Sequence, residues 1–361
     1  MPDPRDRRYA ELLVDTCVGV QPGWQVLVLG SPAARPLLEE VVRLIAERDA
    51  YALLRVTFGS WFVGSRVWSR TAPLERLAVA APIEQHALET CDALIAIDAP
   101  ENTRDAADVS PERTAALQGA YRPAMERIFR HEVPWVGCQY PTPALAQEAG
   151  MATDEFADFL YAACLLDWDA ERARMQRLAD RFDAADEVRI VAEGTDLRLS
   201  LAGRRMKVDA GGANVPGGEF FGCPVETSAE GVIAFTEFPA VYGGRELRGI
   251  RLRFEGGVVV DASAETNEAY LLEVLDSDEG SRRLGELGIG CNPGITRYMR
   301  NTLFDEKIDG TVHLALGNGM PDLGGENVSR LHWDIVKDLR APGTRIELDG
   351  EAVQRDGAWL V

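Results

Sequence analysis

A histidine and an aspartate stand two residues apart in the segment RLHWDIV, at His332 and Asp334. The apolar and β-branched neighbours predict an extended strand, in which side chains two residues apart leave the same face. An imidazole and a carboxylate that converge from one face can hold a divalent metal ion. Short His-x-Asp matches also arise by chance, so the pair alone leaves a metal site and a structural pair both open.

Three further residues have the side-chain types that such a site needs. His313 interrupts the apolar run TVHLALG, Glu286 lies among small and apolar residues in RRLGELGIG, and Glu219 follows two glycines in NVPGGEFFGCP. A carboxylate in apolar surroundings has to be neutralised by a proton, a basic partner or a metal ion. Taken singly, each also fits a structural role: a hydrogen-bonded core histidine, a helix-surface glutamate and an exposed loop acid.

Two of the four histidines carry no such signal. His86 lies in the helical stretch EQHALETC, and His131 lies at a helix end before Pro134. We expect both to be structural or surface residues.

Composition and charge limit the class of protein. A chain of 361 residues exceeds the size at which one hydrophobic core keeps growing, so we expect two domains. The formal net charge of −20 repels phosphate and anionic lipid, which predicts no nucleic-acid partner and no membrane surface. No segment has the length of a signal peptide's apolar region or the ~20 apolar residues of a membrane span. The six scattered cysteines fit free thiols in a reducing compartment, and we expect a cytoplasmic protein.

The first half of the chain alternates between short apolar runs and helical stretches. Apolar runs occupy 25–30, 51–58, 92–99 and 134–141, and helical patterns occupy 9–20, 35–50, 111–130 and 154–185. This order predicts an α/β domain over residues 1–185, with a Rossmann-like open parallel sheet covered on both faces. The turn after the first run reads LGSPAARP and lacks the Gly-x-Gly-x-x-Gly pattern, so dinucleotide binding is not supported.

The second half changes to a period of two residues. Charged residues alternate with apolar ones in the segments 187–203, 249–265 and 344–361, and glycine-rich loops separate them. This pattern predicts a mixed, β-rich α+β domain over residues 186–361, which also contains all the candidate metal ligands.

Several blocks of the chain resemble, in order and spacing, the thermophilic metalloaminopeptidase family of the aminopeptidase T type. The blocks with the most specific motifs are residues 214–239, 277–295, 301–317 and 324–336, and weaker likeness extends to 9–30 and 194–204. The resemblance implies that Glu219, Glu286, His313, His332 and Asp334 are metal ligands. It implies a site for two divalent ions, or for one tight and one loose ion, with zinc, cobalt or manganese suited to the mixed oxygen and nitrogen ligands.

The same resemblance implies a function. A protein of this family is expected to be a metal-dependent aminopeptidase that acts on peptides or small aminoacyl substrates, and to form a homodimer. No carboxylate is singled out as the general base. The family pattern has a tyrosine shortly after the strand histidine, whereas this chain has Met320 in the loop LGNGMPDLGG. The loss of a phenol predicts a more open site, a changed substrate or a weakened enzyme.

Two other functions stay open. Ring-opening dioxygenases of hydroxylated pyridines resemble these aminopeptidases but hold one Fe(II) with two histidines and one carboxylate. In them the position that matches Glu286 is a histidine and the one that matches His313 is apolar, so the residues of this chain favour the hydrolase. A binding protein without activity is the third possibility, and the complete ligand set argues against it, since unused buried acids and imidazoles are a stability burden.

Overall fold

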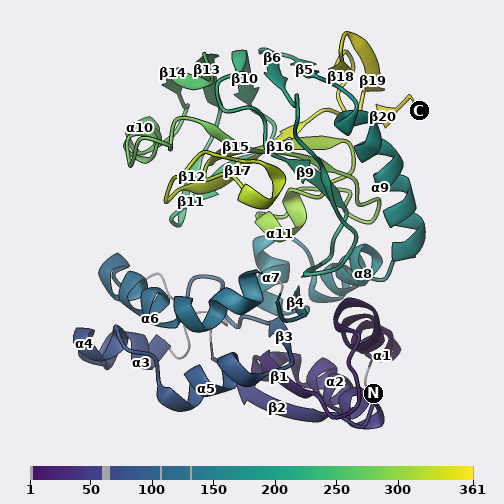
Figure 1. The fold of residues 1–361 in the computed structure, drawn as a ribbon, viewed down its shortest axis with the longest axis vertical. Coiled ribbons are helices and arrows are strands. Elements are labelled where there is room, and N and C mark those ends of the chain that lie inside the picture. The colour runs from purple at the N-terminus through teal and green to yellow at the C-terminus, as the bar shows by residue number, and fades with distance from the viewer. Residues whose placement is uncertain (1–2, 59–65, 106–107, 131, 361) are drawn as a thin grey trace. The chain divides into compact units, whose positions relative to one another are not determined.

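The computed structural model describes residues 3–58, 66–105, 108–130 and 132–360 (Figure 1). The chain groups into two compact units: unit 1 comprises Met1–Leu166 and Gly211–Pro216, and unit 2 comprises Asp167–Ala210 and Gly217–Val361. The predicted division into two folding domains, residues 1–185 and 186–361, stays a prediction. Among the described residues, none of the helices combines the length and the apolar character that a bilayer crossing requires.

Unit 1 contains a parallel sheet. Its strands are β1 (Gln25–Gly30), β2 (Tyr51–Val56), β3 (Ala93–Asp98), β4 (Trp135–Gln139) and β8 (Asn214–Val215). They lie in the order β2-β1-β3-β4-β8, and every pairing between them is parallel. The predicted parallel sheet is therefore confirmed, while its Rossmann-like classification stays a prediction.

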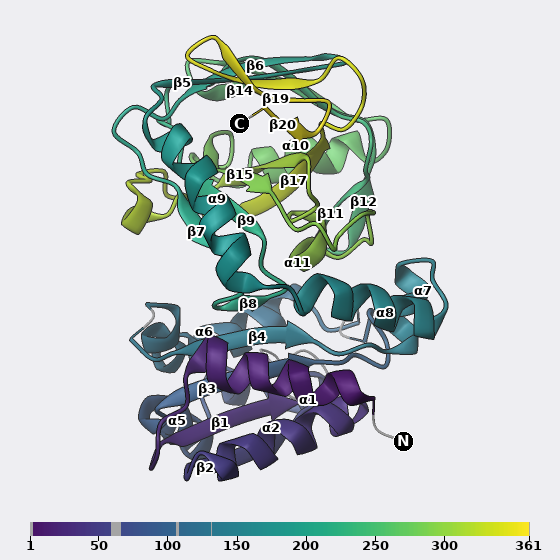
Figure 2. The same ribbon diagram turned by 90° about the vertical axis from the view of Figure 1, so that its right-hand side faces the viewer.

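Helices cover both faces of this sheet (Figure 2). Leu27 and Leu29 of β1 and Leu94 of β3 form a buried cluster with Leu88 and Ile128. This cluster seats two of the helices on one face, because Leu88 and Ile128 belong to them. The helices and helical turns of unit 1 are α1 (Pro4–Glu11), η1 (Leu12–Val18), η2 (Pro32–Ala34), α2 (Arg35–Glu47), α3 (Arg66–Thr71), α4 (Leu74–Leu77), α5 (Pro82–Thr90), α6 (Pro111–Phe129), α7 (Pro143–Glu148) and α8 (Thr153–Cys164).

Unit 2 is built mainly from two antiparallel sheets. The larger sheet has the order β14-β13-β10-β6-β5-β18-β19-β20. Its strands are β5 (Glu187–Ala192), β6 (Thr195–Ser200), β10 (Glu230–Phe235), β13 (Ile250–Glu255), β14 (Val258–Ser263), β18 (Arg345–Leu348), β19 (Glu351–Arg355) and β20 (Ala358–Trp359). Buried and solvent-accessible residues alternate along β6 and β13, as the period-two pattern predicted.

The second sheet of unit 2 carries the candidate site. Its strands are β7 (Lys207–Asp209), β9 (Glu219–Gly222), β15 (Leu284–Gly290), β16 (Thr311–Gly317) and β17 (His332–Asp338), in the order β17-β16-β15-β9-β7. The remaining elements of unit 2 are the ribbon of β11 (Ala240–Tyr242) and β12 (Arg245–Leu247), and the helices α9 (Trp168–Asp183), α10 (Glu268–Leu275), α11 (Thr302–Asp305) and η3 (Pro321–Leu323).

Two predicted helices differ from the observed ones. The first helix begins at Pro4, because the Asp3 side chain accepts a hydrogen bond from the Arg5 amide at 2.9 Å, and it changes to a π-helix from Leu12 to Val18. The stretch 154–185 is two helices, α8 and α9, rather than one. The second begins where the Asp167 carboxylate accepts the Ala170 amide at 3.1 Å, which caps α9.

Candidate metal centre

The pairing of three strands places four of the predicted ligands on one face of the second sheet. Asp334 of β17 pairs with Ala315 of β16, and Ala315 pairs with Glu286 of β15. Paired residues share a face, as do residues two apart in one strand, so His332 and His313 lie on this face too. Glu286 thus lies on a strand instead of a helix surface, and its side chain is only 9% exposed.

The fifth predicted ligand enters the same face from β9. Glu219 pairs with Gly290 of β15, and its side chain is 7% exposed, so it is not an exposed loop acid. The next residue, Phe220, points to the opposite face and packs edge-on against Phe182 of α9, with ring centroids 5.1 Å apart. This aromatic contact holds β9 in place and thereby fixes where the Glu219 carboxylate emerges.

Glycines make room for the polar side chains. Gly288 of β15 pairs with His313, and a Cβ atom added to Gly288 would lie 1.9 Å from Nε2 of the imidazole. The ring therefore lies directly over the glycine. Any side chain at position 288 would displace it.

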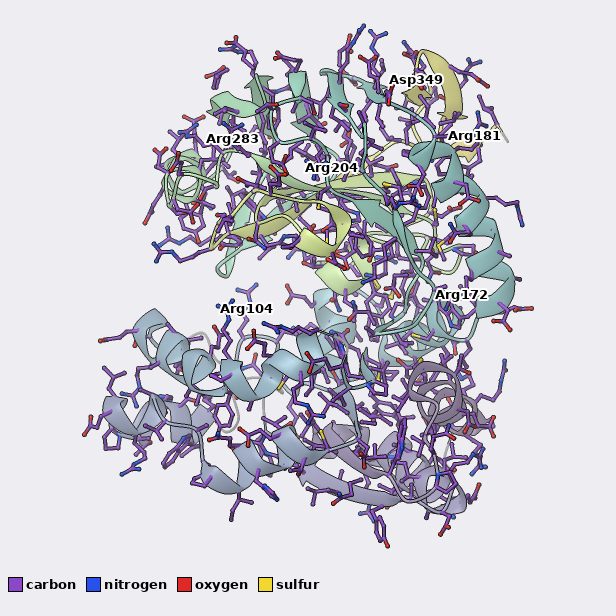
Figure 3. The ribbon with its side chains drawn as sticks, in the orientation of Figure 1. Arg104, Arg172, Arg181, Arg204, Arg283 and Asp349 are labelled. Carbon is purple, nitrogen blue, oxygen red and sulfur yellow. The ribbon has the colours of Figure 1, made fainter. Side chains whose placement is uncertain are left out.

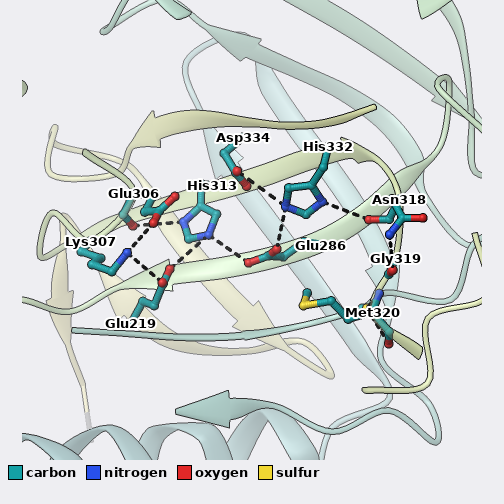
Figure 4. Close-up of polar contacts among 11 residues, drawn as sticks. Glu219, Glu286, Glu306, Lys307, His313, Asn318, Gly319, Met320, His332 and Asp334 are labelled. Atoms are coloured by element: carbon teal, nitrogen blue, oxygen red, sulfur yellow. Dashed lines mark hydrogen bonds and ion pairs between the residues drawn. The ribbon is translucent and has the colours of Figure 1, made fainter. Parts of the chain in front are cut away.

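The Glu286 carboxylate lies between the two imidazoles (Figure 4). Its Oε1 atom is 3.3 Å from Nε2 of His313, and its Oε2 atom is 3.3 Å from Nε2 of His332. Each oxygen thus faces a different histidine. A carboxylate in this position can bridge two metal ions.

The other two carboxylates lie at the two ends of this arrangement. Oε2 of Glu219 is 3.3 Å from Nε2 of His313, and Oδ2 of Asp334 is 3.6 Å from Nε2 of His332. Two sets of three side chains therefore have ligand atoms within 4.8 Å of one another. We call Glu219, Glu286 and His313 the inner group, and Glu286, His332 and Asp334 the outer group.

Backbone carbonyls fix both imidazoles. Nδ1 of His313 donates to the carbonyl oxygen of Glu306 at 3.0 Å, and Nδ1 of His332 donates to that of Asn318 at 3.1 Å. A carbonyl only accepts, so Nδ1 carries the proton in each ring and Nε2 faces the carboxylates. Such an outer hydrogen bond on the second ring nitrogen is what orients a metal-binding histidine.

The electrostatic field of the site favours positive charge. Burial lowers the pKa of His313, but its hydrogen bond to Glu286 and the charges of nearby carboxylates raise that pKa to about 10. His332 has the same opposing influences, and its pKa is raised to about 9. Burial raises the pKa of Glu286, and the hydrogen bonds from the two imidazoles outweigh it and lower that pKa to about 2. A cation placed between these residues is therefore strongly stabilised.

The negative charges of the two end carboxylates, Glu219 and Asp334, are offset less completely by nearby positive groups than that of Glu286. Burial raises the pKa of Glu219 to about 8, although the Lys307 ammonium opposes that change. Burial and then the charge of Glu286 raise the pKa of Asp334 to about 6. Each of these carboxylates would be stabilised by a further cation beside it.

The residues present fit divalent metal ions. Oε2 of Glu219 is buried and accepts no hydrogen bond from the described residues, and it faces Nε2 of His313 at 3.3 Å, so it is directed into the site. Three carboxylates and two imidazole nitrogens form a mixed oxygen and nitrogen donor set, which suits zinc, cobalt or manganese. The structure thus brings all five predicted residues together, and their role as ligands is taken up below as a proposal.

A glycine-rich loop borders the outer group. The backbone N–H of Asn318 donates to the carbonyl oxygen of Leu331 at 2.7 Å, which closes the loop 318–331 at its base. The carbonyl oxygen of Asn318 is the one that accepts from His332. The Met320 amide donates to Sγ of Cys223 at 3.2 Å, and Figure 4 shows the Met320 side chain directed toward the cluster.

A buried ion pair fastens the same loop. Glu226 accepts the Glu326 amide at 2.7 Å and pairs with Arg204 at 2.7 Å, and the Arg204 and Glu226 side chains are only 10% and 15% exposed. Arg283 donates to the Glu226 carbonyl at 3.0 Å; Figure 3 shows both arginines. The loop that carries Met320 is therefore held at both its base and its outer part.

Three residues of the site were not predicted from the sequence. Lys307 contacts Glu219, Asn318 holds His332 and Gly288 lies under His313. In GELGIG, Gly288 and Gly290 stand two and four residues after Glu286 and share its face of the strand, which is a signal for open space beside that carboxylate. Of the remaining histidines, His86 is exposed as expected, and His131 lies outside the described residues.

Comparison with known proteins gives one consistent family. Residues 3–359 match the model of the thermophilic metalloprotease (M29) family. Aminopeptidase 2 of Geobacillus stearothermophilus is 27% identical over 98% of this chain and 97% of its own length. Aminopeptidase T of Thermus aquaticus is 29% identical, with 70% of this chain and 72% of the relative covered.

Two solved structures share the fold. Wild-type AmpT from Thermus thermophilus superposes with a TM-score of 0.84 at 24% identity and covers 99% of both chains. A 2,5-dihydroxypyridine dioxygenase from Pseudomonas putida KT2440 superposes with a TM-score of 0.63 at 16% identity, covering 100% of this chain and 99% of the other. These likenesses confirm a mixed fold with a parallel sheet and antiparallel sheets.

Replacement of Gly288 by alanine tests the geometry of the inner group. The added Cβ would meet the His313 ring at 1.9 Å, so Gly288→Ala should displace the imidazole and weaken metal binding about tenfold or more. Isothermal titration of the metal-free protein with zinc measures this effect. The control is Gly119→Ala on α6, where a Cβ meets nothing within 4 Å, and which should bind zinc as the unaltered protein does. Equal zinc affinity in both variants would contradict the placement of His313.

Proposed function

The chain belongs to the thermophilic metalloprotease (M29) family, as its motifs predicted, and we propose that it is a metal-dependent aminopeptidase with a two-ion centre. Its substrates would be peptides or small aminoacyl compounds, from which it removes the N-terminal residue. The named relatives are aminopeptidases, which supports this activity. The five ligands would be Glu219, Glu286, His313, His332 and Asp334.

One observation carries the two-ion proposal. The Glu286 carboxylate faces His313 with one oxygen and His332 with the other, at 3.3 Å in each case. Each imidazole has a further carboxylate beside it, Glu219 on one side and Asp334 on the other. The arrangement therefore offers two adjacent sets of ligands that share one carboxylate.

The side chains have separate tasks in this scheme. Bound divalent ions would supply a coordinated water of lowered pKa and would polarise the scissile carbonyl. The inner group would hold one ion away from solvent, because the His313 side chain is 1% exposed. The outer group opens to solvent through His332, whose side chain is 40% exposed, so we expect the substrate to approach from this side.

The charge of the protein fits an N-terminal substrate. The formal net charge is −20, far more than two divalent ions would neutralise, so the surroundings of the site stay negative. An acidic site attracts the α-ammonium group of a free peptide N-terminus and repels a C-terminal carboxylate. This preference supports exopeptidase action from the N-terminal end.

The ring-cleaving dioxygenase is the weaker alternative. Its fold is shared, so the fold does not separate the two functions. The dioxygenase pattern needs a histidine at position 286 and an apolar residue at position 313. This chain has Glu286 and His313 in contact instead, which supports the hydrolase.

The proposal extends to the state of the protein in solution and in the cell. From the family resemblance we propose a homodimer, which light scattering coupled to size-exclusion chromatography tests directly. The six cysteines carry thiol groups that are not joined in disulfides, which supports the proposed cytoplasmic location.

Removal of the metal tests the proposed function as a whole. Treatment with a chelator should abolish the release of p-nitroaniline from a panel of aminoacyl p-nitroanilides, and zinc, cobalt or manganese should restore it. Elemental analysis of the active protein should give two ions per chain. One iron per chain, together with oxygen uptake on a dihydroxypyridine, would establish the dioxygenase instead.

Truncation of His332 tests the outer group. Because the side chain is 40% exposed, His332→Ala should fold normally, lose one ion and lose turnover by at least about 100-fold. His86→Ala, an exposed histidine on α5, is the matched control and should keep both ions and full activity. Full peptidase activity in the His332 variant would remove this residue from the centre.

Restoration of the family's phenol tests the role of position 320. Met320→Tyr should raise peptide hydrolysis by about tenfold or more, because a hydroxyl directed at the cluster can donate to the developing oxyanion. Met320→Phe supplies the ring without the hydroxyl and should show no such gain. If both variants lose activity equally, the pocket has been reshaped around methionine for another substrate.

A further inference from the structure

A fully buried lysine lies behind the inner group. Nζ of Lys307 is 3.0 Å from Oε1 of Glu219, and the Lys307 side chain has no exposed area. The ammonium also pairs with the side chain of Glu306. Lysines are almost never buried completely without such partners. Since it is inaccessible to solvent, Lys307 has no route to a substrate.

Lys307 contacts one oxygen of Glu219, and the other oxygen is directed toward His313. Oε1 forms an ion pair with the Lys307 ammonium, whereas Oε2 accepts no hydrogen bond from the described part of the chain and faces His313. A carboxylate anchored through one oxygen has its second oxygen fixed in direction. This is the arrangement that a ligand bound through one oxygen requires.

The residue before Lys307 acts on the same group. The Glu306 carbonyl accepts Nδ1 of His313 at 3.0 Å, so two consecutive residues hold two of the three inner ligands from behind (Figure 4). Both follow α11 directly, in the turn that leads into β16. Among the described residues, no lysine or arginine pairs with the outer group in a comparable way: His332 is held by a backbone carbonyl, and Asp334 contacts His332.

We infer that Lys307 is a positioning residue that aligns Glu219 for the inner metal ion and leaves the outer ion unaffected. The inference rests on the two-ion centre proposed above. Without the ammonium, the buried carboxylate loses the contact that fixes its orientation. Partners that orient metal ligands from outside typically change metal affinity about 10–100-fold when they are removed.

A second buried lysine provides a matched control. Lys337 of β17 also has no exposed area and pairs with Glu237 at 2.6 Å. It lies an odd number of residues from both His332 and Asp334, and therefore on the opposite face of the strand. Lys337→Met removes a buried ion pair from the same sheet without touching the inner group.

The test compares metal affinities in four proteins: the unaltered chain, Lys307→Met, Lys307→Gln and Lys337→Met. Each metal-free protein is titrated with zinc by calorimetry against a competing chelator, and thermal unfolding checks that it is folded. We expect two ions in the unaltered protein. Lys307→Met should bind the outer ion equally well and the inner ion about tenfold or more weakly. Lys307→Gln keeps a hydrogen-bond donor, so its affinity for the inner ion should lie between those of the unaltered protein and Lys307→Met.

The control decides between positioning and general destabilisation. Lys337→Met should lower the unfolding temperature and keep both zinc affinities. Three results would overturn the inference: unchanged affinities in both Lys307 variants, an equal loss at both ions, or a tighter inner ion after loss of the competing positive charge. If Lys307→Met does not fold, Lys307→Gln gives the decision alone.

Failure of this inference is distinct from failure of the proposed function. An unaltered protein that binds one ion overturns the two-ion centre and this inference together. If the protein binds two ions and has peptidase activity, but the Lys307 variants keep the affinity for the inner ion, only the role of Lys307 is overturned. Two ions without peptidase activity, and an inner ion weakened by Lys307→Met, overturn the aminopeptidase and keep the positioning role.

Discussion

Three carboxylates buried on one face of a sheet are the constraint on which the rest of unit 2 depends. A carboxylate taken out of water is unfavourable unless a cation and hydrogen bonds replace the solvent. Glu286 has an imidazole at each oxygen, and Glu219 has the Lys307 ammonium. Imidazoles with raised pKa values act as the cations when no ion is bound, and metal binding requires them to release protons. One geometry therefore serves both states, because a metal ion takes over the charge that the protons carry.

The sheet meets this constraint through register and small residues. Pairing of β17, β16 and β15 puts Asp334, Ala315 and Glu286 in one row, so that only the outer two have polar side chains. Gly288 leaves the space that the His313 ring fills. A one-residue slip of any strand would turn its ligands to the other face. The polar cluster thus depends on residues that contribute no functional group, Gly288 and Ala315 among them.

The sequence predicted the parallel sheet, the β-rich second half and the five residues that meet in unit 2. Strand periodicity is local, which made the sheets and the shared face of His332 and Asp334 predictable from the pattern. Glu219, Glu286 and His313 joined that pair only through the resemblance to the metalloaminopeptidase family. Lys307 was not predicted, since its burial depends on the turn after α11 and on contact with β9, which lies far away in the sequence. The split between α8 and α9 was missed because both halves are amphipathic, and only the cap at Asp167 separates them. Contacts of this kind follow from tertiary packing and leave no periodic signal.

The fold is shared by proteins of low sequence identity, 24% and 16% for the two solved structures. Both solved structures share this architecture, so the fold alone does not decide the function, which has to be argued from the residues of the site. In the proposed centre, positions 286 and 313 would supply the shared carboxylate and the buried imidazole, which lie 3.3 Å apart. Position 320 is of another kind: it lies in a loop tied down by Asn318 and Glu226, beside the solvent-accessible outer group. Its side chain can therefore change while the ligands stay in place. A thioether donates no hydrogen bond, so under the proposed function Met320 would change the contacts offered to a substrate while the five proposed ligands keep their places.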